Sequence, residues 1–291
     1  VDRAAVLQAA GEAEQAAELL SRVAQVFGAR RLRQAQAEAE LALANALIMT
    51  NPVGAVAAAR RAARRFRARG NELGALRADA CRLTGLVLLT RAAPAPGAPP
   101  AAAGWQAARR VADLRGRLTS TAEALAGRRM AAEAAMLRLQ RARLDLLSGR
   151  LTEAREELRR VHVSARGPIT ARLLLREVKA EVAAAEQRPA RVLGHAAAGL
   201  DELERWQQTF GSIDLQSSAA TYGRTLALLG IRAAVRSGDT GQVFAWSERA
   251  RSLASRVVPV RTHADPETLA DLTELRRLRL LAASGSGVPS P

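Results

Sequence analysis

Side chains that could perform nucleophilic catalysis are few in this chain. It contains one cysteine, Cys81, and three histidines, His162, His195 and His263. A thiol beside an imidazole can act as a nucleophile that is activated by a general base. However, Cys81 is more than 80 positions from every histidine, and neither residue type sits on a glycine-rich loop that would expose a nucleophile. We therefore expect a buried structural thiol, and histidines that serve as surface or packing residues.

The spacings of common catalytic and metal-binding motifs are also missing. The sequence has no Cys-x-x-Cys, no His-Glu-x-x-His, no phosphate loop and no Gly-x-Ser-x-Gly. We therefore predict that this chain is not an enzyme and holds no cofactor or metal. A single cysteine cannot form an internal disulfide, which fits a reducing cytoplasm. The longest apolar runs are far shorter than the roughly 20 residues of a membrane span, so no membrane partner is expected.

The largest chemical signal is positive charge, carried almost entirely by arginine. The formal net charge is +16 and Lys179 is the only lysine, a skew that is typical of coding bias in a GC-rich genome. Excess positive charge nevertheless favours acidic partners at long range. A solvated helix face is the alternative interpretation of the densest cluster, whose exposed side lacks aromatic rings that could stack on nucleic-acid bases. The candidate face for an acidic partner consists of Arg60, Arg61, Arg64, Arg65 and Arg67.

The elements that must position these side chains are expected to be helices. Alanine, leucine, arginine and glutamate dominate, aromatic residues make up 3% of the chain, and β-branched residues are scattered. Good helix formers are thus abundant, while side chains suited to a pleated sheet are scarce. The composition predicts an all-α fold, and a length of 291 residues fits either two domains or one elongated array.

An internal repeat favours the array. Phe27 and Phe66 lie 39 positions apart in similar contexts, which is the period of a helical hairpin. Between them, Asn51-Pro52 predicts a turn, because proline disfavours helix at the preceding residue and suits the first turn of a helix. In the helix that follows, over residues 53–69, Phe66 shares one stripe with alanines. Phe66 is therefore expected to be buried and the nearby arginines to be mostly exposed.

Turn and capping signals divide much of the remaining chain into further helices. A proline-rich loop is expected at 92–103, and Ser120 opens a sequence with capping-box spacing, which predicts that a helix begins there. Gly70 is placed to end a helix in the left-handed conformation, and Gly149 and Gly238 mark turns. The remaining predicted helices span about 31–49, 72–91, 105–117, 120–147, 151–163, 169–186, 190–208, 215–236 and 242–256.

The C-terminal part is expected to leave the array. Asp265-Pro266-Glu267 combines an N-cap, a proline at the first helical position and an acidic first turn, which predicts a last helix. The predicted organisation is a repeat array over 1–258, a strap and connecting helix over 259–283, and a flexible tail over 284–291. Because the chain begins at Val1 without a methionine or a leader, we expect it to be a piece of a longer protein.

Aromatic side chains gather in the C-terminal third. Phe244, Ser247 and Ala250 follow one another at three-residue spacing on one side of their helix, so we expect most of these rings to be packed in the core. Some exposure at the edge would suit docking of a following domain. The cluster consists of Trp206, Phe210, Tyr222, Phe244 and Trp246.

Four segments have a recognisable pattern when taken in order: LALANAL at 41–47, RFRARGNE at 65–72, FGSIDLQ at 210–216 and FAWSERARS at 244–252, followed by the strap that begins at Pro259. Together they resemble the tetratricopeptide-repeat region of actinobacterial CHAT-domain proteins. The resemblance implies helical hairpins stacked as a right-handed superhelix, an α-solenoid, in front of a C-terminal caspase-like domain that cleaves peptide bonds. The catalytic histidine and cysteine of that domain have no counterpart in this chain, so no catalytic residue carries over.

The expected function is that of a cytoplasmic protein-interaction scaffold, because stacked helical pairs present an extended surface that suits peptide or protein binding. By the resemblance, the chain would bind or sense a protein or peptide partner, with an acidic one as the candidate, and position or regulate the CHAT domain of the parent chain. The alternative is the sensor arm of a bacterial transcription regulator, although no recognition-helix motif occurs in these 291 residues. Direct nucleic-acid binding is the least expected function, and its affinity would fall steeply with salt.

Overall fold

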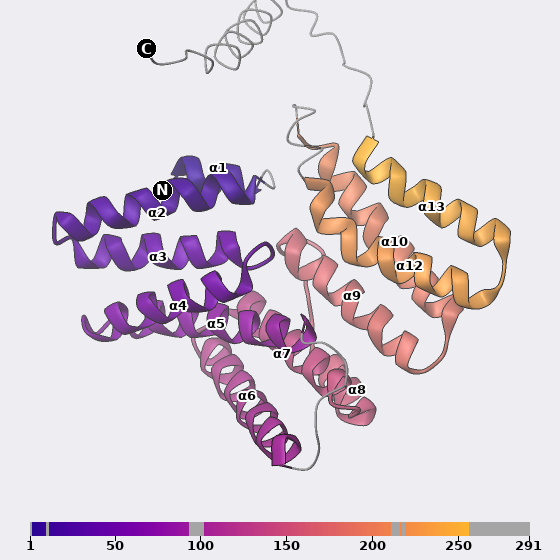
Figure 1. Cartoon of the computed structure of the whole chain (residues 1–291), viewed down its shortest axis with the longest axis horizontal. Coiled ribbons are helices and arrows are strands. Elements are labelled where there is room, and N and C mark those ends of the chain that lie inside the picture. The colour runs from indigo at the N-terminus through magenta and orange to yellow at the C-terminus, as the bar shows by residue number, and fades with distance from the viewer. Residues whose placement is uncertain (1, 10–11, 93–101, 211–215, 217–218, 256–291) are drawn as a thin grey trace, which may run out of the picture. The chain divides into compact units, whose positions relative to one another are not determined.

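The fold is all-α, as predicted, over the part of the chain that a computed structural model describes (Figure 1). The described residues are 2–9, 12–92, 102–210, 216 and 219–255, and they form no strand. Internal contacts divide the chain into two units, 1–255 and 256–291, of which the second lies outside the described residues. The strap, the last helix, the tail and most of the proline-rich loop therefore stay predictions.

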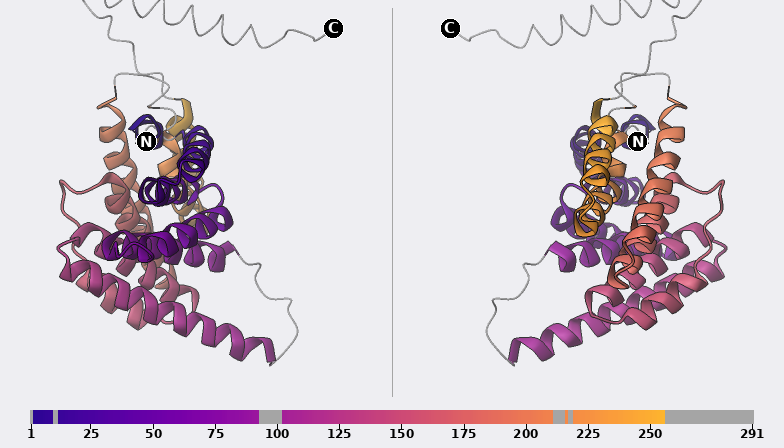
Figure 2. Two further views of the ribbon diagram at one scale, coloured as in Figure 1. Left: turned by 90° about the vertical axis from the view of Figure 1, so that its left-hand side faces the viewer. Right: turned by 90° about the vertical axis from the view of Figure 1, so that its right-hand side faces the viewer.

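Short turns separate most of the helices, which follow one another as neighbours along the chain (Figures 1 and 2). Within the described ranges, no helix is both long enough and apolar enough to cross a membrane. The elements in chain order are α1 (Asp2–Ala9), α2 (Ala13–Ala29), α3 (Arg33–Leu47), α4 (Pro52–Arg67), α5 (Glu72–Ala92), α6 (Ala102–Gly127), α7 (Ala131–Leu147), α8 (Leu151–Arg160), α9 (Ile169–Ala185), α10 (Pro189–Gln207), the 3-10 helix η1 (Ala220–Gly223), α12 (Arg224–Ser237) and α13 (Thr240–Ser255).

The helices pack in pairs, and the first helix of each pair also packs against the first helix of the next. The pairs are α3 with α4, α5 with α6, α7 with α8, α9 with α10, and α12 with α13. Contacts between first helices join α3 to α5, α5 to α7, α7 to α9 and α9 to α12. The second helix of each pair reaches the first helix of the next pair as well, as the succession in Figure 1 shows. The first helices therefore form one continuous row within this unit.

Several turns between consecutive helices repeat one backbone feature, a residue in the left-handed conformation just past a helix end. Glycine occupies this position at Gly70, Gly149 and Gly238, with φ of 65°, 73° and 72°. The turn signals at these three glycines are thus confirmed. At other turns the same conformation is held by a residue with a side chain, namely Arg31, Arg129 and Gln187.

The predicted turn at Asn51-Pro52 is confirmed. The Oδ1 atom of Asn51 accepts a hydrogen bond from the amide of Gly54 at 2.9 Å, and α4 begins at Pro52. An asparagine cap of this kind satisfies an amide that has no partner within the helix. The caps of α4 therefore agree with the local sequence.

The helix start predicted at Ser120 is wrong. The capping-box signal at Ser120 lies inside α6, which continues to Gly127, and the hydroxyl of Ser120 donates to the carbonyl of Arg117 at 3.3 Å. A serine inside a helix can bond to the preceding turn in this way, so the motif spacing alone does not mark a helix start. Within the helix predicted over 215–236, the described residues 216 and 219 are helical, and the 3-10 helix η1 (Ala220–Gly223) precedes α12, which begins at Arg224.

Small side chains fill much of the core, which lets neighbouring helices approach closely. Five of the six buried residues of α4 are alanines, and the sixth is Phe66, which is 2% exposed. The expected burial of Phe66 is thus confirmed. Its ring lies against Gly74 of α5, where an added Cβ would come within 2.6 Å of it.

Aromatic side chains near the C-terminal end of this unit divide into packed and exposed rings. Trp246 is buried against Gly230 of α12, and the ring of Trp206 packs edge-on against Phe210 and Tyr222 with centroids 4.7 and 5.8 Å away. Phe244, however, is 69% exposed. The expectation of core packing is therefore correct for Trp246 and wrong for Phe244.

The contact between Gly230 and Trp246 leads to a prediction about the stability of the fold. An alanine at position 230 would place its Cβ 2.1 Å from the indole ring, so Gly230→Ala is expected to lower the free energy of unfolding by about 1 to 3 kcal/mol through overpacking. At Gly194 of α10, no described neighbouring element comes within 4 Å of an added Cβ, so Gly194→Ala is the control and should raise stability by up to about 1 kcal/mol. Denaturant unfolding compares the two, and equal effects would contradict the packing of Trp246 on α12.

Candidate functional site

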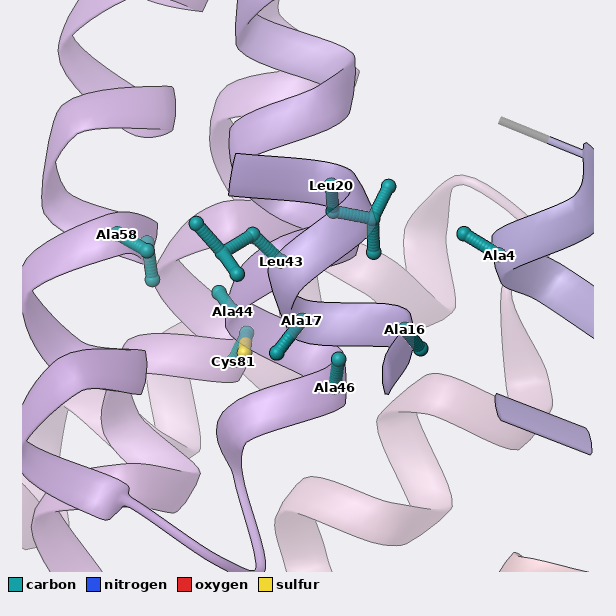
Figure 3. Close-up of a cluster of buried hydrophobic side chains, with 10 residues drawn as sticks. Ala4, Ala16, Ala17, Leu20, Leu43, Ala44, Ala46, Ala58 and Cys81 are labelled. Atoms are coloured by element: carbon teal, nitrogen blue, oxygen red, sulfur yellow. The ribbon is translucent and has the colours of Figure 1, made fainter. Parts of the chain in front are cut away.

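Cys81 lies in an apolar environment on α5. Its side chain packs in a cluster built from α1 to α4 that includes Leu20, Leu43 and Ala44 (Figure 3). Burial raises the pKa of the Cys81 thiol to about 12, which disfavours the thiolate that nucleophilic attack requires. The expectation that this thiol is buried is confirmed.

The described histidines lie apart from this cluster. His162 is exposed in the segment after α8, although the sequence pattern predicted a helix there. His195 is half-buried on α10, and α10 packs against α9, η1 and α12 without an extended contact to α5 in the described part of the chain. Desolvation and the charges of Lys179, Arg176 and Arg191 lower the pKa of His195. The third histidine, His263, lies outside the described residues.

The burial of Cys81 predicts a slow thiol reaction. In the native protein we expect Cys81 to react with the disulfide reagent DTNB far more slowly than in denaturant, because the reagent needs an exposed thiolate. Ser148→Cys supplies an exposed comparison thiol on the turn after α7. Absorbance of the released thiolate follows both reactions, and a native Cys81 that reacts as fast as the thiol of the Ser148→Cys variant would contradict the packing in Figure 3.

Three of the five candidate arginines on α4 are engaged in ion pairs within the chain. Arg61 and Arg65 both meet Glu40 of α3, with Nε to carboxylate distances of 3.3 and 2.9 Å, and the side chain of Glu40 is only 5% exposed. Arg67 pairs with Asp79 of α5. These arginines therefore connect neighbouring helices, and their guanidinium groups are already partnered.

The other two candidates on α4 stay free of such pairs. Arg60 and Arg64 are exposed, lie one helical turn apart, and form no ion pair with a described residue. The α4 face thus offers two available cations, neither of which lines either of the two hollows described below. A solvated helix face accounts for their geometry.

A hollow lies on the row of first helices, and we call it the arginine pocket. Its volume is about 740 Å³, and its walls come from α5, α7, α9 and α12 together with the start of α10. Pockets of this size fit small ligands or a few residues of a peptide. The basic side chains that line it are Arg91, Arg143, Arg188, Arg232 and Arg236.

A buried ion-pair network forms the floor of the arginine pocket. Arg143 of α7 is 4% exposed, and it reaches Glu177 through Nη2 and Glu181 through Nε, each at 2.8 Å. Arg91 of α5 approaches the other oxygen of Glu181 at 3.3 Å. Desolvation acts to lower the pKa of Arg143, but the charges and hydrogen bonds of Glu181 and Glu177 outweigh it, so this pKa is raised. The network ties three first helices together.

Not every cation of the arginine pocket is used internally. Arg188 pairs with Glu186 at 3.3 Å beside the turn into α10. Arg232 and Arg236 are exposed, lie one turn apart on α12, and form no ion pair with a described residue. Two guanidinium groups on one helix face are thus available to a ligand.

A second hollow of about 650 Å³ lies over α8, α9 and α10. Its cations include Arg159 and Arg191, which form no ion pair with a described residue, and Arg155, which pairs with Glu186. The apolar part of its lining consists of Leu158 and Val161. This hollow therefore resembles the arginine pocket in charge but has a smaller apolar wall.

Comparison with models of known protein families finds no match, and comparison with curated proteins finds none. The structure therefore defines this chain as a helical protein with two basic hollows on neighbouring helices. Among the described residues, no group of three or more histidine, cysteine or acidic side chains could hold a metal ion.

The sequence interpretation missed the arginine pocket because its residues are scattered. They come from five helices, and the residues at the two extremes, Arg91 and Arg236, are 145 positions apart. The one local signal was the spacing of Arg232 and Arg236, four residues apart on one helix face. The cluster on α4 was easy to find only because its arginines are adjacent in the chain.

Proposed function

We propose that this chain is a tetratricopeptide-like scaffold that binds a protein or peptide partner. The observation that carries the proposal is the packing of each first helix on the next first helix, from α3 to α12. Repeats that contact only their neighbours build an extended surface for binding, and a right-handed superhelix is the arrangement we propose for them. The arginine pocket on this row of helices is the kind of concave site at which ligands bind.

In this proposal the scaffold positions or regulates a caspase-like CHAT domain carried elsewhere in the same protein. The support is the resemblance of segments 41–47, 65–72, 210–216 and 244–252 to the repeat region of actinobacterial CHAT-domain proteins. The coding sequence beyond the codon for Pro291 tests this part. An extension into a caspase-like domain is the expected result, and a different catalytic or DNA-binding domain there would overturn it.

The binding function is tested by panning a random peptide library on the purified chain. We expect enrichment of a shared motif whose binding is lost when side chains on the first helices are changed. Substitutions on exposed positions of α4 should leave that binding intact, since α4 is a second helix. Failure of any motif to enrich would contradict a peptide-binding scaffold.

A further inference from the structure

We propose that the arginine pocket holds an acidic peptide segment of the partner, with two of its carboxylates on Arg232 and Arg236 and an apolar side chain against Leu147 and Leu229. The inference rests on the proposed function, because it names the site and the partner chemistry of that scaffold. Three features of the pocket carry it: its free cations, its apolar wall and its rigid floor.

The free cations select for negative charge. Arg91 and Arg143 are neutralised by Glu181 and Glu177, whereas Arg232 and Arg236 of α12 meet no carboxylate among the described residues. Guanidinium groups bind carboxylates through paired, charge-assisted hydrogen bonds. A ligand with two carboxylates spaced about one helical turn apart would satisfy both arginines at once.

The apolar wall favours a ligand that has an apolar side chain between its two carboxylates. Leu147 of α7 is 47% exposed at the edge of the pocket, and Val192 and Leu229 line it from α10 and α12. The described lining contains no aromatic ring on which a base could stack. The lining therefore favours a peptide of acidic and aliphatic residues over nucleic acid.

The floor of the pocket is fixed before a ligand arrives. Arg143 is held by two carboxylates of α9 on one side and is nearly fully buried. Its position therefore changes little on binding, which lowers the entropic cost of association. The second hollow has free arginines as well, but only two aliphatic residues line it.

The experiment measures binding of a fluorescein-labelled peptide of aspartate and glutamate residues interspersed with leucines, using the full chain and fluorescence anisotropy. The combined variant Arg232→Gln with Arg236→Gln is expected to weaken binding by about 100-fold, or about tenfold for each charge-assisted hydrogen bond. Circular dichroism melting checks that the variant is folded. Both side chains are exposed, so its melting curve should match that of the parent chain.

Two matched variants test the location. Arg60→Gln with Arg64→Gln removes the same charge, at the same spacing, from α4, and Arg159→Gln with Arg191→Gln removes it from the second hollow. The α4 variant is expected to change the affinity by less than about threefold, since charge outside the pocket acts only through the screened field. The second hollow shares Arg188 with the arginine pocket, so the variant there is expected to weaken binding by more than the α4 variant and by less than the α12 variant. A larger loss in either control than in the α12 variant would overturn the assignment to the arginine pocket.

Two further probes test the chemistry. A peptide with asparagine and glutamine in place of the acidic residues should bind at least about tenfold more weakly, and equal binding would overturn the acidic partner. A single-stranded oligonucleotide that displaces the peptide at equal charge concentration would likewise overturn the peptide in favour of nucleic acid. An enriched library motif that is apolar or basic would contradict this inference while leaving the scaffold function intact, whereas no motif at all would contradict the scaffold.

Discussion

Replacement of Arg143 by alanine is expected to lower the free energy of unfolding by about 3 to 5 kcal/mol. The guanidinium is 4% exposed and lies 2.8 Å from a carboxylate oxygen of Glu177 and of Glu181. Alanine would leave both carboxylates on α9 nearly buried without this cation, and their desolvation cost would no longer be offset. Denaturant unfolding followed by circular dichroism measures the loss.

The control for this prediction removes the positive charge of Arg143 together with the negative charges of its two glutamate partners. A chain with Arg143→Met, Glu177→Gln and Glu181→Gln should recover most of the lost stability, because neutral side chains of similar size carry no uncompensated charge. Arg60→Ala, at an exposed arginine without a described ion pair, should change the free energy by less than about 0.5 kcal/mol. A loss for Arg143→Ala as small as that for Arg60→Ala would mean that the network does not stabilise the fold.

Local sequence signals predict the ends of helices correctly where glycine marks the turn. Gly70, Gly149 and Gly238 take up the left-handed conformation that glycine adopts without steric cost. Arg129 and Gln187 adopt the left-handed conformation too, although neither arginine nor glutamine is a residue type that predicts it. The end of α6 was therefore misplaced, since its turn at Arg129 carries no glycine in the left-handed position.

Side-chain burial was predictable only where a whole stripe of residues agreed. Phe66 follows a run of alanines at helical spacing, and several turns of α4 therefore indicate the same buried face. The predicted burial of Phe244 depends on only two further residues, Ser247 and Ala250, which follow it at a spacing of three. Trp246, two positions away, occupies the contact with α12, so Phe244 points elsewhere and is exposed.

The candidate site depended on long-range packing, which no local pattern encodes. Adjacent arginines on α4 suggested a binding face, but Glu40 of α3 and Asp79 of α5 neutralise three of them. Those acidic residues are 12 to 25 positions away from their partners. Whether an arginine is available to a ligand therefore depends on the ion pairs of the folded chain. These ion pairs leave Arg232 and Arg236 on α12 available.

Replacement of Phe66 by alanine is expected to destabilise the protein by about 3 to 5 kcal/mol. The ring is 2% exposed and packs in a cluster with Ala37, Ala62 and Ala75, which are too small to close the space it would vacate. Both the lost burial of the ring and the remaining cavity contribute to the cost. Denaturant unfolding of the variant measures it.

Phe244→Ala is the matched control, because it removes the same ring from a helix position that is 69% exposed. Its expected loss is below about 1 kcal/mol, the range of a surface substitution. Since both variants delete identical atoms, the difference between them reports packing and not the chemistry of phenylalanine. A loss below about 1 kcal/mol for Phe66→Ala would mean that α4 does not bury this face against α3 and α5, and the packing of this second helix between two first helices would lose its support.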